Sequence, residues 1–158
     1  MKLYHASPIK NLKILKPQRT ISNDKYIGDF VFATRHKKLA LMYMLPKGFP
    51  LLMNIKSSKP YVVLCGNVRD ILKKDRGGAL YELSTESFHR TPQTALSNYE
   101  MVSKESISPL NETDYESVTQ ALDKKGIAIY IVDNNMFDKL ILNPMQDSIV
   151  QTLDRYFP

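Results

Sequence analysis

Two side chains of this sequence have types and positions that suit catalysis, His5 near its start and Glu100 in its second half. Glu100 stands between Tyr99 and Met101, and the run to Val102 alternates as a strand does, so the glutamate faces away from its apolar neighbours. On the wall of a cleft, this carboxylate would be desolvated and available for chemistry, whereas in bulk water it would be an ordinary surface residue. The sequence is compatible with both environments of Glu100, the wall of a cleft and the surface in bulk water.

Several familiar kinds of active site are excluded by spacing. The histidines His5, His36 and His89 have no Cys, His or carboxylate partners at the intervals of metal ligands, so we expect no metal. The Walker and Rossmann glycine patterns and the elbow pattern of a serine nucleophile are absent. What remains is the histidine, the glutamate and an aromatic-bearing strand and helix between them.

The stretch 26–43 is the element around which the rest can be arranged. Phe30–Ala33 is apolar and too short for a helix, so we predict a buried strand that follows a turn at Gly28. Thr34 closes the strand and is predicted to cap the helix that follows. The polar tip from Thr34 to His36 would then lie at the edge of whatever cavity the strand borders.

The rest of the chain alternates between short strands and helices. We predict strands at 3–6, 61–65, 79–83, 99–102 and 127–132, and a helix at 68–74 that Asn67 caps. Two further helices are predicted to start at 111–114 and at Asn143, and 18–25 is predicted to be a polar loop. A chain of 158 residues with these elements fits a single domain over 1–158.

The composition indicates the cellular compartment and the kinds of partner that suit this chain. The single cysteine, Cys65, ends an apolar run and is interpreted as a small buried hydrophobe, which suggests a reducing compartment. Neither a secretory signal nor a membrane span is recognisable, so we expect a cytoplasmic protein with no membrane partner. Residues 1–79 carry 16 lysines and arginines against 4 acidic residues, and residues 80–158 carry 6 against 12. The basic half would suit an anionic ligand such as a dinucleotide or nucleic acid, or it would pack against the acidic half and be partly cancelled.

Three short segments together form a known pattern. They are Tyr4-His5-Ala6-Ser7, then 28–33 with the helix that ends in Tyr43, and 99–103 with Ile107 and Pro109. In this order they resemble the three motifs of the ADP-ribosyltransferase fold shared by diphtheria toxin and the poly(ADP-ribose) polymerases, with alanine in place of the first motif's glycine. The resemblance spans about residues 3–110 and implies an α+β fold with a split, mostly antiparallel sheet and flanking helices. Residues 111–158 would be a helix-strand-helix extension of the same domain.

The resemblance implies that NAD is a substrate rather than a permanent cofactor. Glu100 would be catalytic, because a carboxylate bonded to the ribose 2′-hydroxyl stabilises the positive charge that develops as nicotinamide leaves. We expect His5, the Thr34 tip and Glu100 to converge on one cleft, with Tyr43 and Tyr26 covering the nicotinamide. The implied NAD-binding residues are His5, Ala6, Ser7, Thr34, Tyr43, Tyr26, Arg19 and Arg35.

Two departures from the family pattern concern the second motif. Val31 stands where the family has a tyrosine, and Tyr43 follows Ala40 by three positions instead of two, which turns its side chain about 100° further round a helix. Either the helix starts one residue later and restores the geometry, or Tyr43 is a core residue.

Three functions are therefore compatible with the sequence. The first is ADP-ribosyl transfer or NAD glycohydrolysis, with an unknown protein or nucleic-acid acceptor. The second is a catalytically degenerate module that binds a nucleotide or nucleic acid through the basic half. The third is an enzyme similar to the RNA 2′-phosphotransferases, which rely on several basic residues that bind the phosphate and have no need of the glutamate.

Overall fold

The fold is of the α+β class, as the sequence predicts. The computed structural model describes residues 1–93 and 98–157, and within these ranges the chain forms nine strands and five helices. The elements group into two compact units, unit 1 from Met1–Met44 and Gly77–Glu116, and unit 2 from Leu45–Arg76 and Ser117–Pro158. Each unit has its own sheet and its own hydrophobic core. A single domain over 1–158 stays a prediction.

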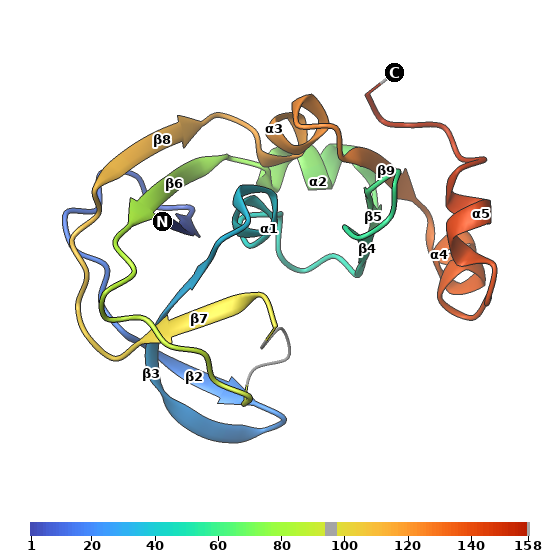
Figure 1. The fold of residues 1–158 in the computed structure, drawn as a ribbon. Helices are drawn as coiled ribbons and strands as arrows, with labels where there is room; N and C mark the ends of the chain where they lie inside the picture. Colours follow the sequence, from blue (N-terminus) through green and yellow to red (C-terminus); the bar gives the residue numbers. More distant parts are fainter. Residues whose placement is uncertain (94–97, 158) are drawn as a thin grey trace. The chain divides into compact units, whose positions relative to one another are not determined.

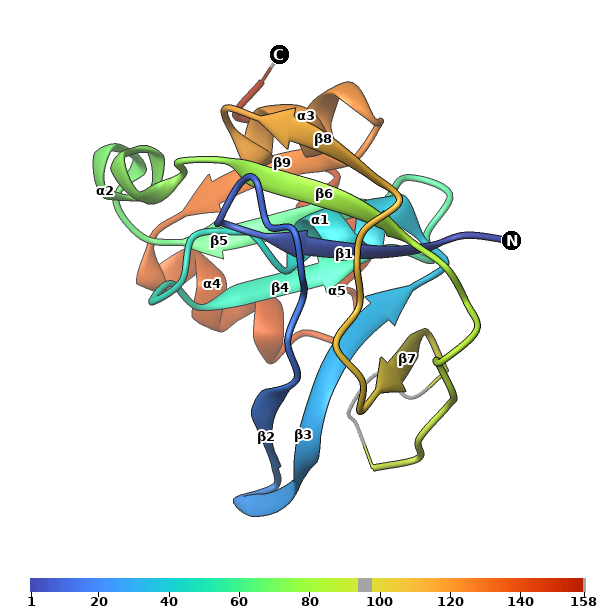
Figure 2. The same cartoon turned by 90° about the vertical axis from the view of Figure 1, so that its left-hand side faces the viewer.

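Unit 1 is built on an antiparallel sheet with the strand order β2-β3-β1-β6-β8, and β7 also pairs with β3 (Figure 2). The register of the described residues joins β1 to β3 at one position, Tyr4 with Thr34, so the sheet is split beyond this row. The largely antiparallel, split sheet is therefore confirmed. Its strands are β1 (Leu3–Ser7), β2 (Gln18–Ser22), β3 (Lys25–Thr34), β6 (Gly78–Leu83), β7 (Glu100–Ser103) and β8 (Asn111–Tyr115).

The β2–β3 hairpin stands where the sequence predicts a polar loop (Figure 2). Asn23 and Asp24 form its turn with φ of 48° and 60°, which is the backbone that a two-residue hairpin connection needs. Gly28 lies inside β3 and not at a turn. The loop prediction is wrong because residues 18–22 pair with residues 25–30 and so form a strand, although the side chains of 18–22 lack an apolar pattern.

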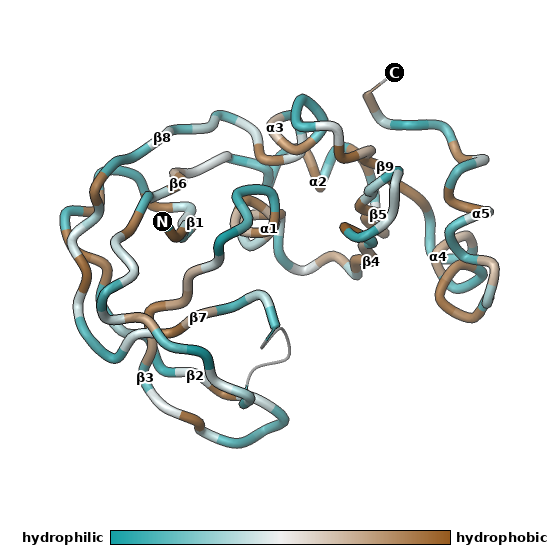
Figure 3. Tube along the Cα trace, viewed as in Figure 1, coloured by the Kyte–Doolittle hydropathy of each residue, from teal (hydrophilic) through white to brown (hydrophobic). Residues whose placement is uncertain are grey.

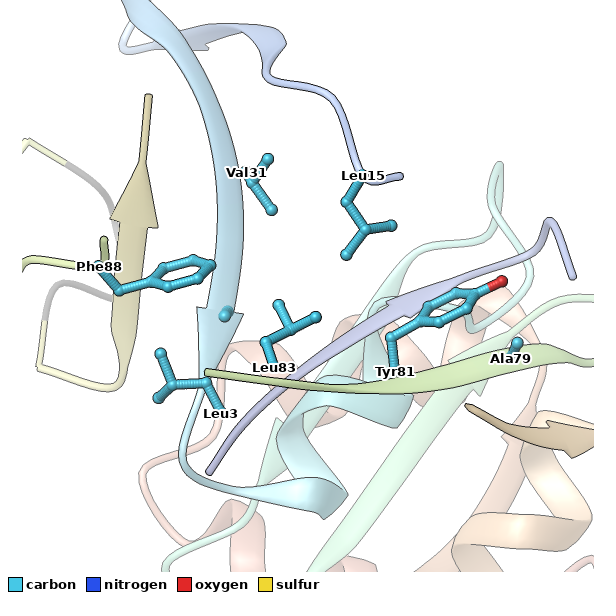
Figure 4. Close-up of a cluster of buried hydrophobic side chains, with 8 residues drawn as sticks. Leu3, Leu15, Val31, Ala79, Tyr81, Leu83 and Phe88 are labelled. Atoms are coloured by element: carbon cyan, nitrogen blue, oxygen red, sulfur yellow. The ribbon is translucent and has the colours of Figure 1, made fainter. Parts of the chain in front are cut away.

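The core of unit 1 lies on one face of the sheet. Side chains from β1, β3 and β6 point into it, and Leu15 and Phe88 come from the connecting segments (Figure 4). Tyr81 is fully buried, and its hydroxyl lies at the rim of the cluster, where it donates to the Ile9 carbonyl at 2.8 Å. The cluster consists of Leu3, Leu15, Val31, Ala33, Ala79, Tyr81, Leu83 and Phe88.

The short helix α1 (Lys37–Met42) lies on the other face of this sheet. Lys37 Nζ is 5.1 Å from the centre of the Tyr4 ring and 3.8 Å from Glu82 Oε1. Tyr4 and Glu82 are register partners on β1 and β6, so their side chains share a face. Since Leu3 and Leu83 carry the core, the α1 face is the opposite one.

Unit 2 contains a three-stranded sheet in the order β4-β5-β9 (Figure 1). β4 (Leu51–Asn54) runs antiparallel to β5 (Tyr61–Cys65), whereas β9 (Ala128–Val132) runs parallel to it. Cys65 is 2% exposed in the core of this unit, as predicted. The helices are α2 (Val68–Lys74), α3 (Val118–Lys124), α4 (Asn134–Ile141) and α5 (Gln146–Val150).

Two helix predictions need correction in their bounds. The residues Asn111–Tyr115 form β8 and pair with β6, and α3 begins only after Ser117, whose hydroxyl accepts a hydrogen bond from the Gln120 amide. The prediction of a helix from 111 is wrong because residues 111–115 pair with the free edge of β6 and form a strand. The last helix starts at Gln146 rather than at Asn143, whose side chain instead accepts from the Met145 amide at 2.8 Å.

Apolar stretches alternate with polar ones along the whole described chain (Figure 3). None of the helices in residues 1–93 and 98–157 is long and apolar enough to cross a membrane.

Candidate functional site

Glu100 opens β7 and lies directly across from Thr34, the last residue of β3. Thr34 is also the register partner of Tyr4, so three strands contribute to one row of side chains. Opposite residues of a strand pair share a face, and Tyr4 faces α1, so this row lies under the helix. Glu100 is 8% exposed. Its side chain is therefore desolvated, and it is not the surface residue in bulk water that the sequence also allows.

Tyr43 reaches this row from the end of α1. It is the C-cap residue of the helix and is 38% exposed, and its hydroxyl donates a hydrogen bond to Glu100 Oε1. Burial, together with the bond to Glu100, raises the pKa of Tyr43, so the phenol keeps its proton and donates the hydrogen bond that Glu100 accepts. Tyr43 is therefore not a core residue, and its shifted spacing still brings it to the glutamate.

The polar tip after β3 borders the same row. Thr34 is fully buried, and its hydroxyl accepts a hydrogen bond from the His36 amide at 3.2 Å. His36 itself is the N-cap of α1, without a side-chain cap, so the prediction that Thr34 caps the helix is wrong by two residues. The His36 ring lies 5.8 Å from the ring of Tyr99, the residue before Glu100. Arg35, between Thr34 and His36, is exposed.

His5 makes its contacts between β1 and β3. Its Nδ1 lies 2.7 Å from the Phe32 carbonyl oxygen, which can only accept, so Nδ1 carries the proton and Nε2 is left as an acceptor. Burial lowers the pKa of His5 below its ordinary value, although the bond to Phe32 opposes this shift. The imidazole is therefore neutral at pH 7, and its ring lies 6.4 Å from that of Tyr81.

The expected convergence of His5 with Thr34 and Glu100 is wrong for the histidine. The register aligns Thr34 and Glu100 with Tyr4, and alternation along β1 turns the next residue, His5, towards the other face. Ala6, by the same alternation, returns to the face of Glu100. The implied NAD-binding residues of the first motif are thus divided between the two faces of the sheet.

A cavity of about 450 Å³ opens where β1 and β3 separate. His5 and Ser7 line it from β1, the segment Phe30–Phe32 lines it from β3, and side chains of the segment 9–18 close it. Mostly apolar walls with a few polar groups are typical of small-molecule sites of this size. Sequence reasoning missed the Phe32 carbonyl and the segment 9–18, because neither a backbone oxygen nor a loop wall leaves a residue-type signal.

Tyr26 and Arg19 lie away from this row, on the β2–β3 hairpin. Tyr26 is at the opposite end of β3 from Thr34, about 26 Å along an extended strand, and it is 58% exposed. Its hydroxyl donates to Asp29 at 3.2 Å, and the Arg19 guanidinium carbon lies 5.5 Å from its ring centre. The expectation that Tyr26 covers a nicotinamide together with Tyr43 is therefore wrong.

The described ranges hold no group of three or more His, Cys, Asp or Glu side chains placed to bind a metal ion. Searches against protein-family models, curated proteins and solved structures found no match to this chain. The candidate site is thus characterised by its own geometry: a buried carboxylate, Glu100, held by the Tyr43 hydroxyl beside Thr34.

Proposed function

We propose that this chain cleaves NAD and transfers ADP-ribose to an acceptor or to water, with Glu100 as the catalytic carboxylate. The observation that supports this function is the hydrogen bond from Tyr43 to Glu100 beside Thr34. It joins the segments that resemble the second and third motifs of the transferases, across 57 positions of sequence. A carboxylate has about four lone-pair sites, so the bond from Tyr43 leaves acceptor capacity for a ribose hydroxyl.

The chemistry needs no group beyond NAD and the acceptor. The bond between the anomeric carbon and the nicotinamide nitrogen breaks, and its electron pair leaves with nicotinamide, which becomes neutral. Positive charge then develops on the ribose, and Glu100 stabilises it through the 2′-hydroxyl. The lone pair of the acceptor or of water forms the new bond to the anomeric carbon, and the acceptor's proton passes to solvent. Tyr43 keeps Glu100 oriented and offers its ring to the nicotinamide.

His5 and Ser7 line the cavity at the split of the sheet, on the face opposite Glu100, so they lie apart from the proposed step at Glu100. Arg35 is kept as a candidate for the pyrophosphate because it is exposed and adjoins Thr34. Cys65 is a free, buried thiol, which agrees with a reducing, cytoplasmic location.

The test is release of nicotinamide from radiolabelled NAD, with and without cell lysate as a source of acceptor. Glu100→Gln keeps the size of the side chain and removes its charge, so we expect it to abolish turnover. Glu105→Gln is the matched control, because Glu105 is exposed and lies five positions further along the same segment. Equal turnover by wild type and Glu100→Gln would remove Glu100 from the mechanism.

The two alternative functions predict different results for NAD binding and turnover by the same proteins. A degenerate binding module would gain thermal stability from NAD by mass action without releasing nicotinamide. An RNA 2′-phosphotransferase-like enzyme would consume NAD only with 2′-phosphorylated RNA, and Glu100→Gln would stay active. Either result would replace the proposed transfer to other acceptors.

A further inference from the structure

Unit 2 contains a cavity of about 640 Å³ with a strongly basic lining. Lys47 and Phe49 come from the segment before β4, and the other side chains come from α2 and the residues after it. The lining consists of Lys47, Phe49, Asp70, Lys73, Lys74 and Arg76, so four of its side chains are cationic and one is acidic.

These cations are not neutralised within the described part of the chain. None of the four forms an ion pair there with a carboxylate, and Lys74 Nζ instead lies 5.1 Å from the centre of the Phe49 ring. The buried carboxylate of Asp75, which lies between Lys74 and Arg76 in the sequence, accepts four hydrogen bonds from the start of α3. The positive charge of the cavity is therefore available to a ligand.

The helix dipole accounts for only part of this cluster. Lys73 and Lys74 lie in the last turn of α2, where cations are favoured next to the free carbonyl groups. Lys47 comes from a different segment of the chain, and Arg76 lies beyond the helix end. Helix stability alone thus gives no reason for the four cations to line one cavity.

We propose that this cavity binds the phosphate backbone of a single-stranded nucleic acid. Its charged side chains Lys47, Asp70, Lys73, Lys74 and Arg76 are all exposed. A site for one nucleotide is instead organised by a few fixed polar groups in a largely enclosed pocket. Exposed cations along an open groove, with an aromatic side chain beside them, are how proteins follow a strand of phosphates. The half-buried Phe49 supplies the aromatic edge.

This binding does not depend on the proposed NAD chemistry. The cavity belongs to unit 2, whereas Tyr43 and Glu100 belong to unit 1. Binding is therefore measured without NAD, and Glu100→Gln is expected to bind nucleic acid as wild type does. Loss of NAD turnover and loss of nucleic-acid binding can then be told apart.

The test is fluorescence anisotropy of a labelled RNA of about 12 nucleotides, within the site sizes of single-strand grooves. The full chain is titrated between about 50 and 200 mM salt, where each phosphate contact on a single strand contributes about 0.7 to the slope of log K against log salt. The pocket variant combines Lys47→Gln, Lys73→Gln and Arg76→Gln. The matched control combines Lys59→Gln, Lys124→Gln and Lys139→Gln, which removes the same charge from exposed positions of the same unit.

We expect the pocket variant to lose about tenfold or more in affinity at low salt and to lower the salt slope by about 2, whereas the control changes neither by as much. Circular dichroism and the Tm check folding; if the triple variant unfolds, Lys73→Gln alone is expected to lower the slope by about 0.7. Equal losses in both triple variants would show diffuse attraction and overturn the proposal. Absence of RNA binding, or equally tight binding of polyglutamate, would overturn it as well.

Discussion

The hydroxyl of Tyr43, at the end of α1, donates a hydrogen bond to the carboxylate of Glu100, at the start of β7. The tyrosine stands one position later than in the transferase motif that the sequence resembles, yet its place at the C-cap still brings it over the row that Glu100 shares with Thr34. A substitution at Tyr43 can therefore separate the contribution of its hydroxyl from that of its ring.

Replacing Tyr43 by phenylalanine keeps the ring and removes the donor to Glu100. A hydrogen bond to a charged group contributes about 1.5–3 kcal/mol, so we expect kcat for NAD cleavage to fall about tenfold to a hundredfold. KM should change little, because Tyr43→Phe keeps the ring that we propose covers the nicotinamide. Steady-state kinetics beside Tyr156→Phe, which removes a hydroxyl from unit 2, provide the comparison. An unchanged kcat in Tyr43→Phe would contradict a role for this hydroxyl.

Stability should fall in acid because of His5. Its pKa in the folded protein lies below the ordinary value of about 6.5, so the unfolded chain binds a proton first as the pH drops. The folded state is then favoured above about pH 6.5 and progressively loses this advantage below it. His5→Gln cannot titrate and should flatten the dependence of Tm on pH between about 7 and 5. His89→Gln removes an exposed imidazole as a control, and identical profiles for His5→Gln and wild type would exclude His5 as the cause.

How far the sequence predicts this fold depends on whether a signal is local. The bounds of α2 are predicted correctly, because Asn67 carries a local signal and its side chain accepts from the Arg69 and Asp70 amides. β2 and β8 escape prediction because each becomes a strand by pairing with a neighbour. Their own side chains have no apolar pattern that would indicate a strand.

The same limit applies to the candidate site. Alternation around Glu100 predicts that the glutamate faces away from Met101, and the structure agrees. The face of His5 relative to Glu100, however, depends on the register of β1 with β3 and of β3 with β7. A shift of one residue in either register would place His5 on the same face as Glu100, and no local feature of the sequence fixes the register.

Asp75 is expected to be the most sensitive polar residue of unit 2. It is 9% exposed and accepts from the amides of Val118 and Thr119 and from the hydroxyls of Ser117 and Thr119, so it satisfies the start of α3. Asp75→Ala leaves two buried amides without an acceptor and should lower the free energy of unfolding by about 3 kcal/mol. Urea denaturation beside the exposed Asp154→Ala measures the difference, and equal losses would contradict the capping role.

Alanine at Gly77 would test the pairing of β8 with β6, which the sequence pattern does not predict. Gly77 precedes β6 with φ of 69°, and a Cβ built on it would lie 1.9 Å from the carbonyl oxygen of Tyr115. That oxygen belongs to the backbone at the end of β8, so it cannot rotate away as a side chain would. Gly126 has a similar φ of 80°, but a Cβ there would meet nothing within 4 Å.

Alanine at either glycine incurs the strain of a left-handed backbone, about 1–2 kcal/mol. Gly126→Ala should cost about that much and no more. Gly77→Ala should cost at least about 2 kcal/mol beyond it, because β8 must move or its pairing with β6 must break. The free energies of unfolding from urea denaturation of both variants give the difference directly. If residues 111–115 were the helix that their sequence suggests, the Tyr115 carbonyl would not lie against Gly77 and the two substitutions would cost the same.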